Sequence, residues 1–178
     1  MSRRRYFRRP VRTVAAKKKW ASNLVNGTVS SSGFSLLAQN SSQTTSPTPV
    51  IVKCGNFKVQ GDVMVTTQGQ GTNRPVPLVF YILFVPEGVG ISDSLVTTHP
   101  EWIMGWTVID AQYIGPATTT TSGSRFSVST RLKRNLNSGD SVVAILQSRD
   151  SSATAQCAFT CQFWTCANWF FLRIILIK

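Results

Sequence analysis

The sequence predicts an all-β fold, a sandwich or a barrel of eight short strands, joined to a basic N-terminal segment. Three observations support this prediction. Thr, Val, Ser and aromatic residues dominate from about residue 24 onward, and turn residues interrupt them at short intervals. No segment of ten or more residues has a convincing apolar period of 3.6 residues. Short strands with irregular connections are typical of β-sandwiches and barrels.

The basic segment at the N-terminus holds most of the net charge. The chain of 178 residues has 19 Lys and Arg against 7 Asp and Glu, a net charge of +12, of which only +3 lies beyond residue 19. Like charges repel, so we expect residues 1–22 to form a disordered basic arm and residues 23–178 to form one domain. Nine basic residues and no acidic ones lie in the first 19 positions: Arg3, Arg4, Arg5, Arg8, Arg9, Arg12, Lys17, Lys18 and Lys19.

The first part of the domain contains two candidate strands and a linker. Residues 25–37 form the first strand, weakened by its two glycines, and the polar residues 40–49 form the linker. Residues 50–67 alternate apolar and polar side chains, with a change of phase at Gly55. An extra residue in a strand shifts the phase in this way, so we expect a β-bulge or kink at Gly55.

The middle of the domain contains the most apolar segment. Residues 78–85 are a continuous apolar run of eight, which indicates a strand buried on both faces. A loop over 68–75 precedes it, and a loop over 92–101 with room for one helical turn follows. Residues 102–114 then form an aromatic-rich strand, and residues 115–124, with four consecutive Thr, form an exposed loop.

The last part of the domain contains three more strands. Residues 126–132 alternate strictly, residues 135–140 form a turn, and residues 142–146 and 155–164 are strands. The side chains predicted to face inward are Phe126, Val128, Thr130 and Leu132 in the first of these strands and Cys157, Phe159, Cys161 and Phe163 in the last.

No catalytic or metal site is predicted. His99 is the only histidine and lies in a turn-like loop, so we interpret it as solvated, and the acidic residues fall mostly at turns and strand ends. Cys157, Cys161 and Cys166 are spaced by four and five, unlike the closer pairs of structural zinc sites. We therefore expect these three and Cys54 to be buried, reduced thiols, and we expect no metal, no cofactor and no enzymatic activity.

The basic arm carries the strongest functional signal. Guanidinium groups bind phosphate oxygens in a bidentate fork, and each neutralised phosphate releases counterions, so binding depends on salt and ignores sequence. Tyr6, Phe7 and Trp20 lie among these charges and are suited to stack on unpaired bases. The alternatives are a nuclear-import signal or a solubilising tail, and import is compatible with nucleic-acid binding. The candidate import residues are Arg3, Arg4, Arg5, Arg8 and Arg9.

A basic arm on an eight-stranded domain resembles the capsid proteins of small icosahedral viruses. Four segments are similar, in the same order, to parts of capsid proteins from circovirus-like viruses, whose genomes are small circular single-stranded DNA. They are residues 2–10 (SRRRYFRRP), 78–88 (LVFYILFVPEG), 99–109 (HPEWIMGWTVI) and 132–140 (LKRNLNSGD).

The resemblance implies an eight-stranded viral jelly roll, with two facing four-stranded antiparallel sheets, and a shell of sixty copies with T=1 icosahedral symmetry. The basic arm would face inward on the DNA genome and also direct nuclear import. The implied partners are further copies of the chain, the genome, host import receptors and a host attachment factor. The implied locations are the virion and, during assembly, the host nucleus.

Two features depart from the family pattern. The domain is shorter than in typical circoviruses, and residues 169–178 add an apolar C-terminal extension. That extension is an extra strand, an inter-subunit arm or a translation of sequence outside the natural frame. It is too short to cross a bilayer and contains Arg173, so no membrane insertion is expected, and the basic N-terminus lacks the apolar run of a secretory signal.

Three other functions remain as alternatives. A cellular single-strand-binding module would place stacking aromatics and basic residues on one face of the domain, and a domain charge of only +3 argues against it. A capsid protein of a satellite-type RNA virus would share the fold and the basic arm. An enzyme is the third alternative, and any histidine-based centre would have to use His99.

Overall fold

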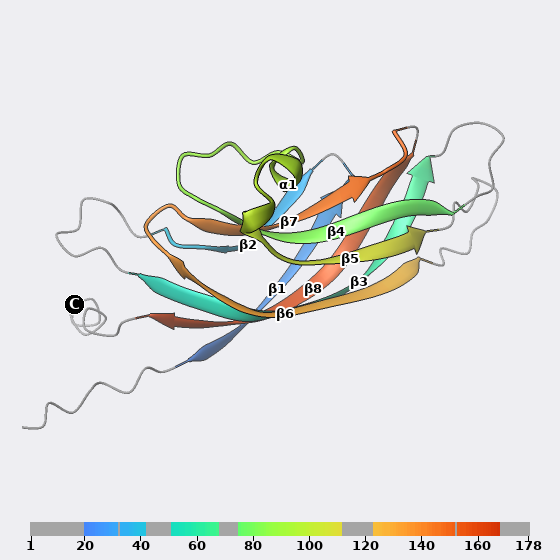
Figure 1. Ribbon diagram of the computed structural model, residues 1–178. Helices are drawn as coiled ribbons and strands as arrows, with labels where there is room; N and C mark the ends of the chain where they lie inside the picture. Colours follow the sequence, from blue (N-terminus) through green and yellow to red (C-terminus); the bar gives the residue numbers. More distant parts are fainter. Residues whose placement is uncertain are drawn as a thin grey trace, which may run out of the picture.

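The computed structural model describes residues 20–31, 33–41, 51–67, 75–111, 123–151 and 153–167. These residues form two four-stranded antiparallel sheets that face each other as a β-sandwich (Figure 1). The prediction of an all-β domain with eight strands is confirmed for this part of the chain, although the predicted ranges number only seven, because the range 25–37 covers two strands.

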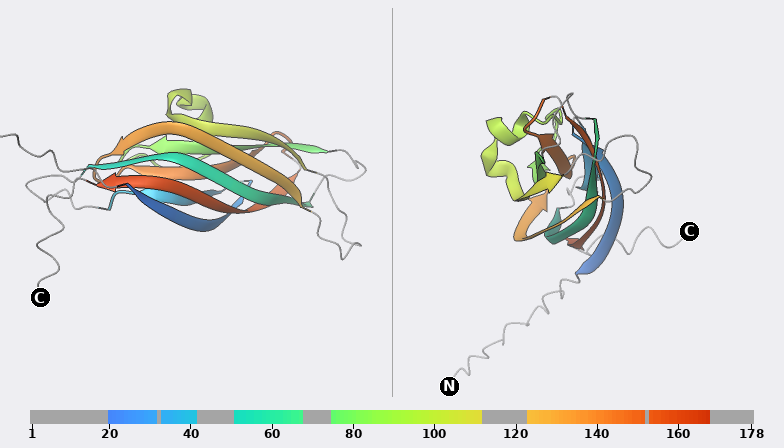
Figure 2. Two further views of the ribbon diagram at one scale, coloured as in Figure 1. Left: turned by 90° about the horizontal axis from the view of Figure 1, so that it is seen from below. Right: turned by 90° about the vertical axis from the view of Figure 1, so that its right-hand side faces the viewer.

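The eight strands are divided equally between the two sheets. Sheet 1 has the order β1-β8-β3-β6 and sheet 2 has the order β2-β7-β4-β5, and all neighbours are antiparallel. The end-on view in Figure 2 shows them as two layers. Sheet 1 contains β1 (Ala21–Ser30), β8 (Thr154–Ala167), β3 (Val52–Thr67) and β6 (Ser124–Leu136); sheet 2 contains β2 (Phe34–Gln39), β7 (Ser141–Ser148), β4 (Val76–Val85) and β5 (Ile103–Ala111).

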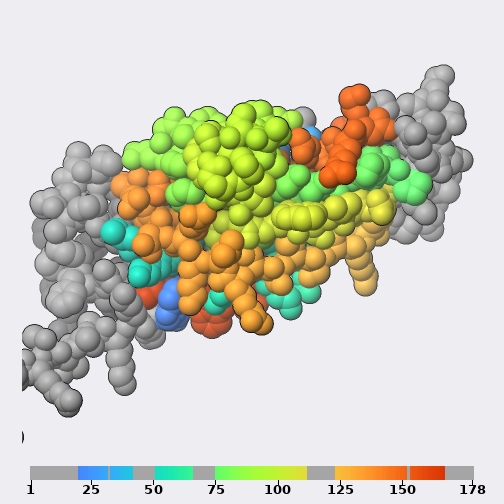
Figure 3. Space-filling model, in the orientation of Figure 1, coloured from blue at the N-terminus to red at the C-terminus, as the bar shows by residue number. Residues whose placement is uncertain are grey.

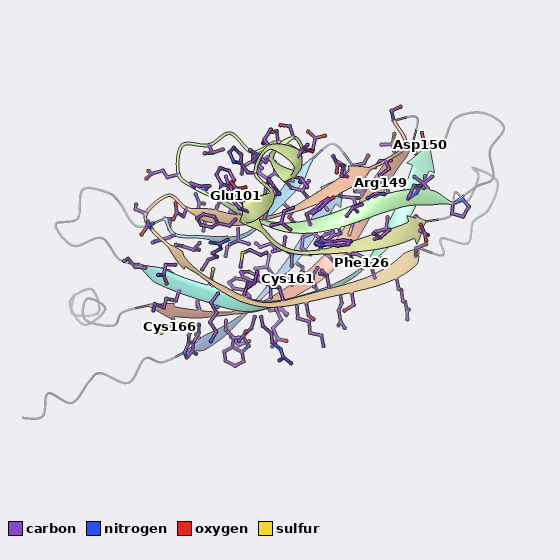
Figure 4. The ribbon with its side chains drawn as sticks, viewed as in Figure 1. Glu101, Phe126, Arg149, Asp150, Cys161 and Cys166 are labelled. Carbon is purple, nitrogen blue, oxygen red and sulfur yellow. The ribbon has the colours of Figure 1, made fainter. Side chains whose placement is uncertain are left out.

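The core lies between the sheets and is built from the inward-facing side chains of both. The ring centroid of Phe80 in β4 lies 4.8 Å from that of Phe126 and 5.6 Å from that of Phe159, both in sheet 1. Phe57 stacks on Phe163 with centroids 5.2 Å apart. Figure 4 shows Phe126 and Cys161 in this interior. Close packing of aromatic rings across the sandwich fixes the spacing of the sheets.

Residues 86–102, which we call the 86–102 connection, cover the outer face of sheet 2. They contain α1 (Leu95–Thr98) and the short 3₁₀ helix η1 (Pro100–Trp102), so the helical turn expected in this loop is confirmed. Leu95 and Val96 are buried in a second apolar cluster with Leu83, Val85, Val143 and Ile145 of sheet 2. Figure 3 shows the connection as a yellow-green mound on this face. Because β4 has the core on one side and this mound on the other, it is buried on both faces, as predicted.

The predicted strand over residues 25–37 is wrong, because it is two strands in different sheets. β1 ends at Ser30, the backbone N–H of Gly33 donates to the carbonyl of Ser30 at 3.0 Å, and β2 then enters sheet 2. A run of alternating residues does not reveal where a chain crosses between layers. β1 also begins at Ala21, so the domain starts two residues before the predicted boundary at residue 23.

The predicted bulge at Gly55 is confirmed, and it explains one wrong prediction. The register of β3 shifts against β6 and β8 next to Gly55, and Asn56 has a left-handed backbone with φ of 55°. Leu132 lies in β6 opposite this irregularity and is 51% exposed, although its alternation predicted burial. Phe126, Val128 and Thr130, which lie before the irregularity, are buried as predicted.

Several predicted boundaries differ from the structure. β6 continues to Leu136, so the turn expected over 135–140 covers only 137–140, and the strand expected over 102–114 is β5 from Ile103 to Ala111. The predictions for residues 42–49, 68–74, 112–122 and 168–178 lie outside the described residues.

Candidate functional site

The nine predicted binding residues, Arg3 to Lys19, lie outside the described residues, so their roles stay predictions. The structure gives the point at which they join the domain. Trp20 is followed directly by β1, which is an edge strand of sheet 1. Residues 1–19 are therefore linked to the domain through sheet 1.

The outer face of sheet 1 is basic. Side chains alternate across a strand, so the residues between core positions point to the outer face. The one acidic side chain there, Asp62, lies opposite Arg125, with Oδ1 and Nε 3.5 Å apart, and both side chains are more than half exposed. In the view from below, Figure 2 shows the strands of this face as β6, β3, β8 and β1 in order. Its basic residues are Lys53, Lys58, Arg125, Arg131 and Lys133.

Aromatic side chains accompany the basic ones at the end of sheet 1 where β1 begins. Gly55 pairs with Trp164 on one side and with Lys133 on the other. Because Gly55 has no side chain, Lys133 lies over it, with Cγ 2.7 Å from the position that a Cβ would take. The Lys133 ammonium lies 5.3 Å from the centroid of the Trp20 ring, within cation–π range, and Trp164 is 39% exposed.

A hollow lies farther along the same sheet. It is lined largely by backbone and small or polar side chains, and the hydroxyl of Thr160 donates to Oδ1 of Asn26 at 2.9 Å across β8 and β1. Gly27 and Gly61 contribute no side chains to it, and a Cβ on Gly61 would overlap the carbonyl oxygen of Ala158. Arg125 and its ion-pair partner Asp62 both line the hollow, so its charged groups are one guanidinium group and one carboxylate.

The outer face of sheet 2 is apolar. One row across the sheet consists of Phe34, Ile145, Tyr81 and Trp106. The 86–102 connection covers the middle of this face, but the two ends of the row stay open: Phe34 is 50% exposed and Trp106 59%. Exposed apolar side chains on edge strands are typical of surfaces that contact another chain.

His99 is less solvated than we interpreted it to be. Its ring stacks on Trp102 with centroids 3.9 Å apart, and Nδ1 lies 3.1 Å from Oε1 of Glu101. The backbone N–H of Glu101 and this contact with His99 lower the pKa of the Glu101 carboxyl. Nη2 of Arg134 donates to the carbonyl of Glu101 at 3.0 Å and joins the connection to β6. Figure 4 shows Glu101 in the connection, and the hydrogen bond from Arg134 ties this part of the connection to sheet 1.

The four cysteines are buried and unpaired, as predicted. Burial raises the pKa of Cys54 to about 11 and the pKa values of Cys157 and Cys161 to about 12, which disfavours the reactive thiolate. Within the described ranges, no three His, Cys, Asp or Glu side chains gather to hold a metal ion. No helix in that part of the chain is long and apolar enough to span a membrane.

Sequence reasoning missed the separation of charge within the domain. The described residues hold seven basic and seven acidic side chains, so their net charge is zero. Five of the basic residues and one acidic residue lie on the outer face of sheet 1, and two basic and six acidic residues lie elsewhere. The alternation of strand positions 125, 131 and 133 was the signal that could have revealed this face.

No family model matches the chain, and no curated protein matches it.

Proposed function

We propose that this chain is a viral capsid protein with a jelly-roll domain, which assembles into a closed shell and holds nucleic acid through its basic arm. The observation that carries the proposal is the division of charge along the chain. Nine basic residues precede residue 20 with no acidic residue among them, and they join an eight-stranded sandwich whose described residues have no net charge.

The pairing of the strands supports the jelly roll. β1 pairs with β8, β2 with β7, β3 with β6 and β4 with β5, as in one long antiparallel hairpin rolled into two sheets. Viral capsid domains have this architecture, and so do lectins and cupins, so the fold alone does not decide the function. The basic arm favours a capsid protein over the other two.

The surface of the domain supports self-assembly. A shell subunit must contact neighbouring copies, and a large like charge on every subunit would oppose this. Near-neutral charge removes that obstacle, and the exposed apolar residues on both edge strands of sheet 2 offer contact area. These are Phe34 and Leu36 in β2 and Trp106 and Val108 in β5, all more than 40% exposed.

The proposed cargo is single-stranded DNA, on the resemblance to circovirus-like capsid proteins, and the proposed shell has sixty copies. Arg3, Arg4, Arg5, Arg8 and Arg9 are the proposed nuclear-import residues, recognised by host import receptors before assembly in the nucleus. A single-strand-binding module is the second candidate, because Trp164 and five basic residues do share one face of the domain. A shell would have the mass of many copies of the chain, whereas the module would remain a monomer or dimer.

A variant of the basic arm tests the proposed role of residues 1–19. Replacing all nine basic residues of the arm by Gln keeps the length of the chain but removes the positive charges of the arm. We expect particles that still form but contain far less nucleic acid, as measured by their ratio of absorbance at 260 and 280 nm. The control replaces Arg149, a basic residue outside both the arm and the outer face of sheet 1, by Gln, and it should leave the nucleic-acid content unchanged. Unchanged nucleic-acid content in the nine-fold variant would refute the role of the arm.

A further inference from the structure

The outer face of sheet 1 has an excess of positive charge that solubility alone does not explain. Soluble domains usually mix both signs of charge on an exposed face, which limits large fields of one sign. Here five basic side chains stand beside a single carboxylate, while six of the seven acidic residues lie elsewhere on the domain. In Figure 4, side chains that end in nitrogen extend from this face. A face with this excess of positive charge attracts polyanions.

The arrangement of the side chains indicates which polyanion. Lys58, Arg131 and Lys133 flank the irregular pairing of β3 and β6, and Trp164 lies in the next strand, two residues from the partner of Lys58. An exposed indole among cationic side chains is suited to stack on an unpaired base while the cations contact the backbone phosphates. A duplex offers no such base, because its bases are already stacked.

The position of the face relative to the basic arm supports the same ligand. Lys133 contacts the ring of Trp20, the residue that connects residues 1–19 to β1. A strand of nucleic acid bound by the arm would thus leave it at the same end of sheet 1 as Lys133 and Trp164. Toward the other end of the sheet the basic side chain is Arg125, which is paired with Asp62.

We propose that the outer face of sheet 1 is a second contact surface for single-stranded nucleic acid, with Lys58, Arg131 and Lys133 on the phosphates and Trp164 on a base. This inference rests on the proposed function, because it assigns the same ligand to the domain as to the basic arm. It also orients the domain in the shell: sheet 1 faces the interior, and sheet 2 with its 86–102 connection faces outward.

The test measures binding of the full-length chain to a fluorescent dodecamer of thymidylate, at concentrations where light scattering detects no particles. The triple variant Lys58→Gln, Arg131→Gln and Lys133→Gln should reduce the slope of log binding constant against log salt concentration by about 2, because each phosphate contact on a single strand contributes about 0.7. Arg149→Gln is the control, because Figure 4 places Arg149 at one end of the sandwich, and it should leave the slope unchanged.

A second pair of variants tests the stacking. Trp164→Ala should weaken binding about fivefold or more, the effect of losing one stacked base. Trp106→Ala, an equally large truncation at an exposed position of sheet 2, should leave binding unchanged. If Trp164→Ala does not fold, as judged by its urea unfolding curve, the salt slopes of the charge variants still decide the question.

The outcomes separate the two proposals. If the full-length chain binds no oligonucleotide, the proposed function fails and this inference fails with it. If the chain binds but the triple variant has the same slope as Arg149→Gln, the inference alone is overturned, because the arm then accounts for the binding by itself. A reduced slope in the triple variant, with an unchanged slope in the control, establishes the second contact surface.

Discussion

The buried thiols of the core make the free energy of unfolding depend on pH. Cys54, Cys157 and Cys161 lie on the inner face of sheet 1 without measurable solvent exposure. Their pKa values rise from 9.0 to about 11 or 12 because burial penalises the thiolate. The folded chain therefore keeps these protons at a pH where the unfolded chain has lost them.

The free energy of unfolding is predicted to fall as pH rises above about 9. Between the unfolded pKa near 9 and the folded values of 11 to 12, the native state binds more protons than the unfolded state, so alkaline pH favours unfolding. Below about pH 8, where the thiols are protonated in both states, they add almost no pH dependence. Urea unfolding at pH 8, 9, 10 and 10.5 measures the effect, and Cys161→Ala should have a smaller decline because one thiol is absent.

The same residues predict slow thiol labelling. At pH 8 an aromatic disulfide reagent should react with the native protein only as fast as the protein opens, and with all four thiols at once in urea. Rapid labelling of Cys54, Cys157 or Cys161 in the native state would contradict the buried placement of that cysteine.

Residue patterns also show how far the sequence predicts this fold. The alternation of 155–164 correctly placed its cysteines and phenylalanines in the core, and the phase change at Gly55 correctly predicted the bulge. Leu132 was misplaced because the effect of a bulge on the neighbouring strand depends on pairing, which is non-local. The basic face was missed for the same reason: its residues come from β3 and β6, which only the folded sheet brings together.

At the scale of elements, the 86–102 connection protects the apolar outer face of sheet 2. Leu95 and Val96 pack on Leu83, Val85 and their neighbours, and Arg134 fastens the connection to β6. Arg134 also places its guanidinium 5.5 Å from the ring centroid of Phe84. Without this cover, the middle of sheet 2 would join its exposed edges in one large apolar surface.

Leu95→Ala is predicted to lower the free energy of unfolding by about 2 kcal/mol or more, because it removes a buried side chain and leaves a cavity over sheet 2. Thr97→Ala, an exposed substitution in the same helix, should change it by less than about 0.5 kcal/mol. Urea unfolding of both variants makes the comparison. Equal stability of the two variants would mean that the connection does not pack on the sheet as described.

At the scale of the whole molecule, the two outer faces differ in chemistry. Sheet 1 presents basic and polar side chains, with Leu24 and Met64 as exposed apolar residues among them, and joins residues 1–19, whereas sheet 2 presents apolar side chains at its edges and the 86–102 connection in its middle. This difference suits a subunit that has nucleic acid on one side and neighbouring copies around it. The near-zero charge of the described residues is thus the sum of two unlike surfaces.

We propose assembly into a closed shell, and the mass of the purified full-length protein distinguishes a shell from a small oligomer. Light scattering after size exclusion, with electron microscopy of the same fractions, should give uniform particles of about 1.2 MDa, sixty copies of the 19.6 kDa chain. Nucleic acid added at low salt should promote them, because it neutralises the basic arms. A mass of one or two chains under every condition, with nucleic acid present, would contradict the account.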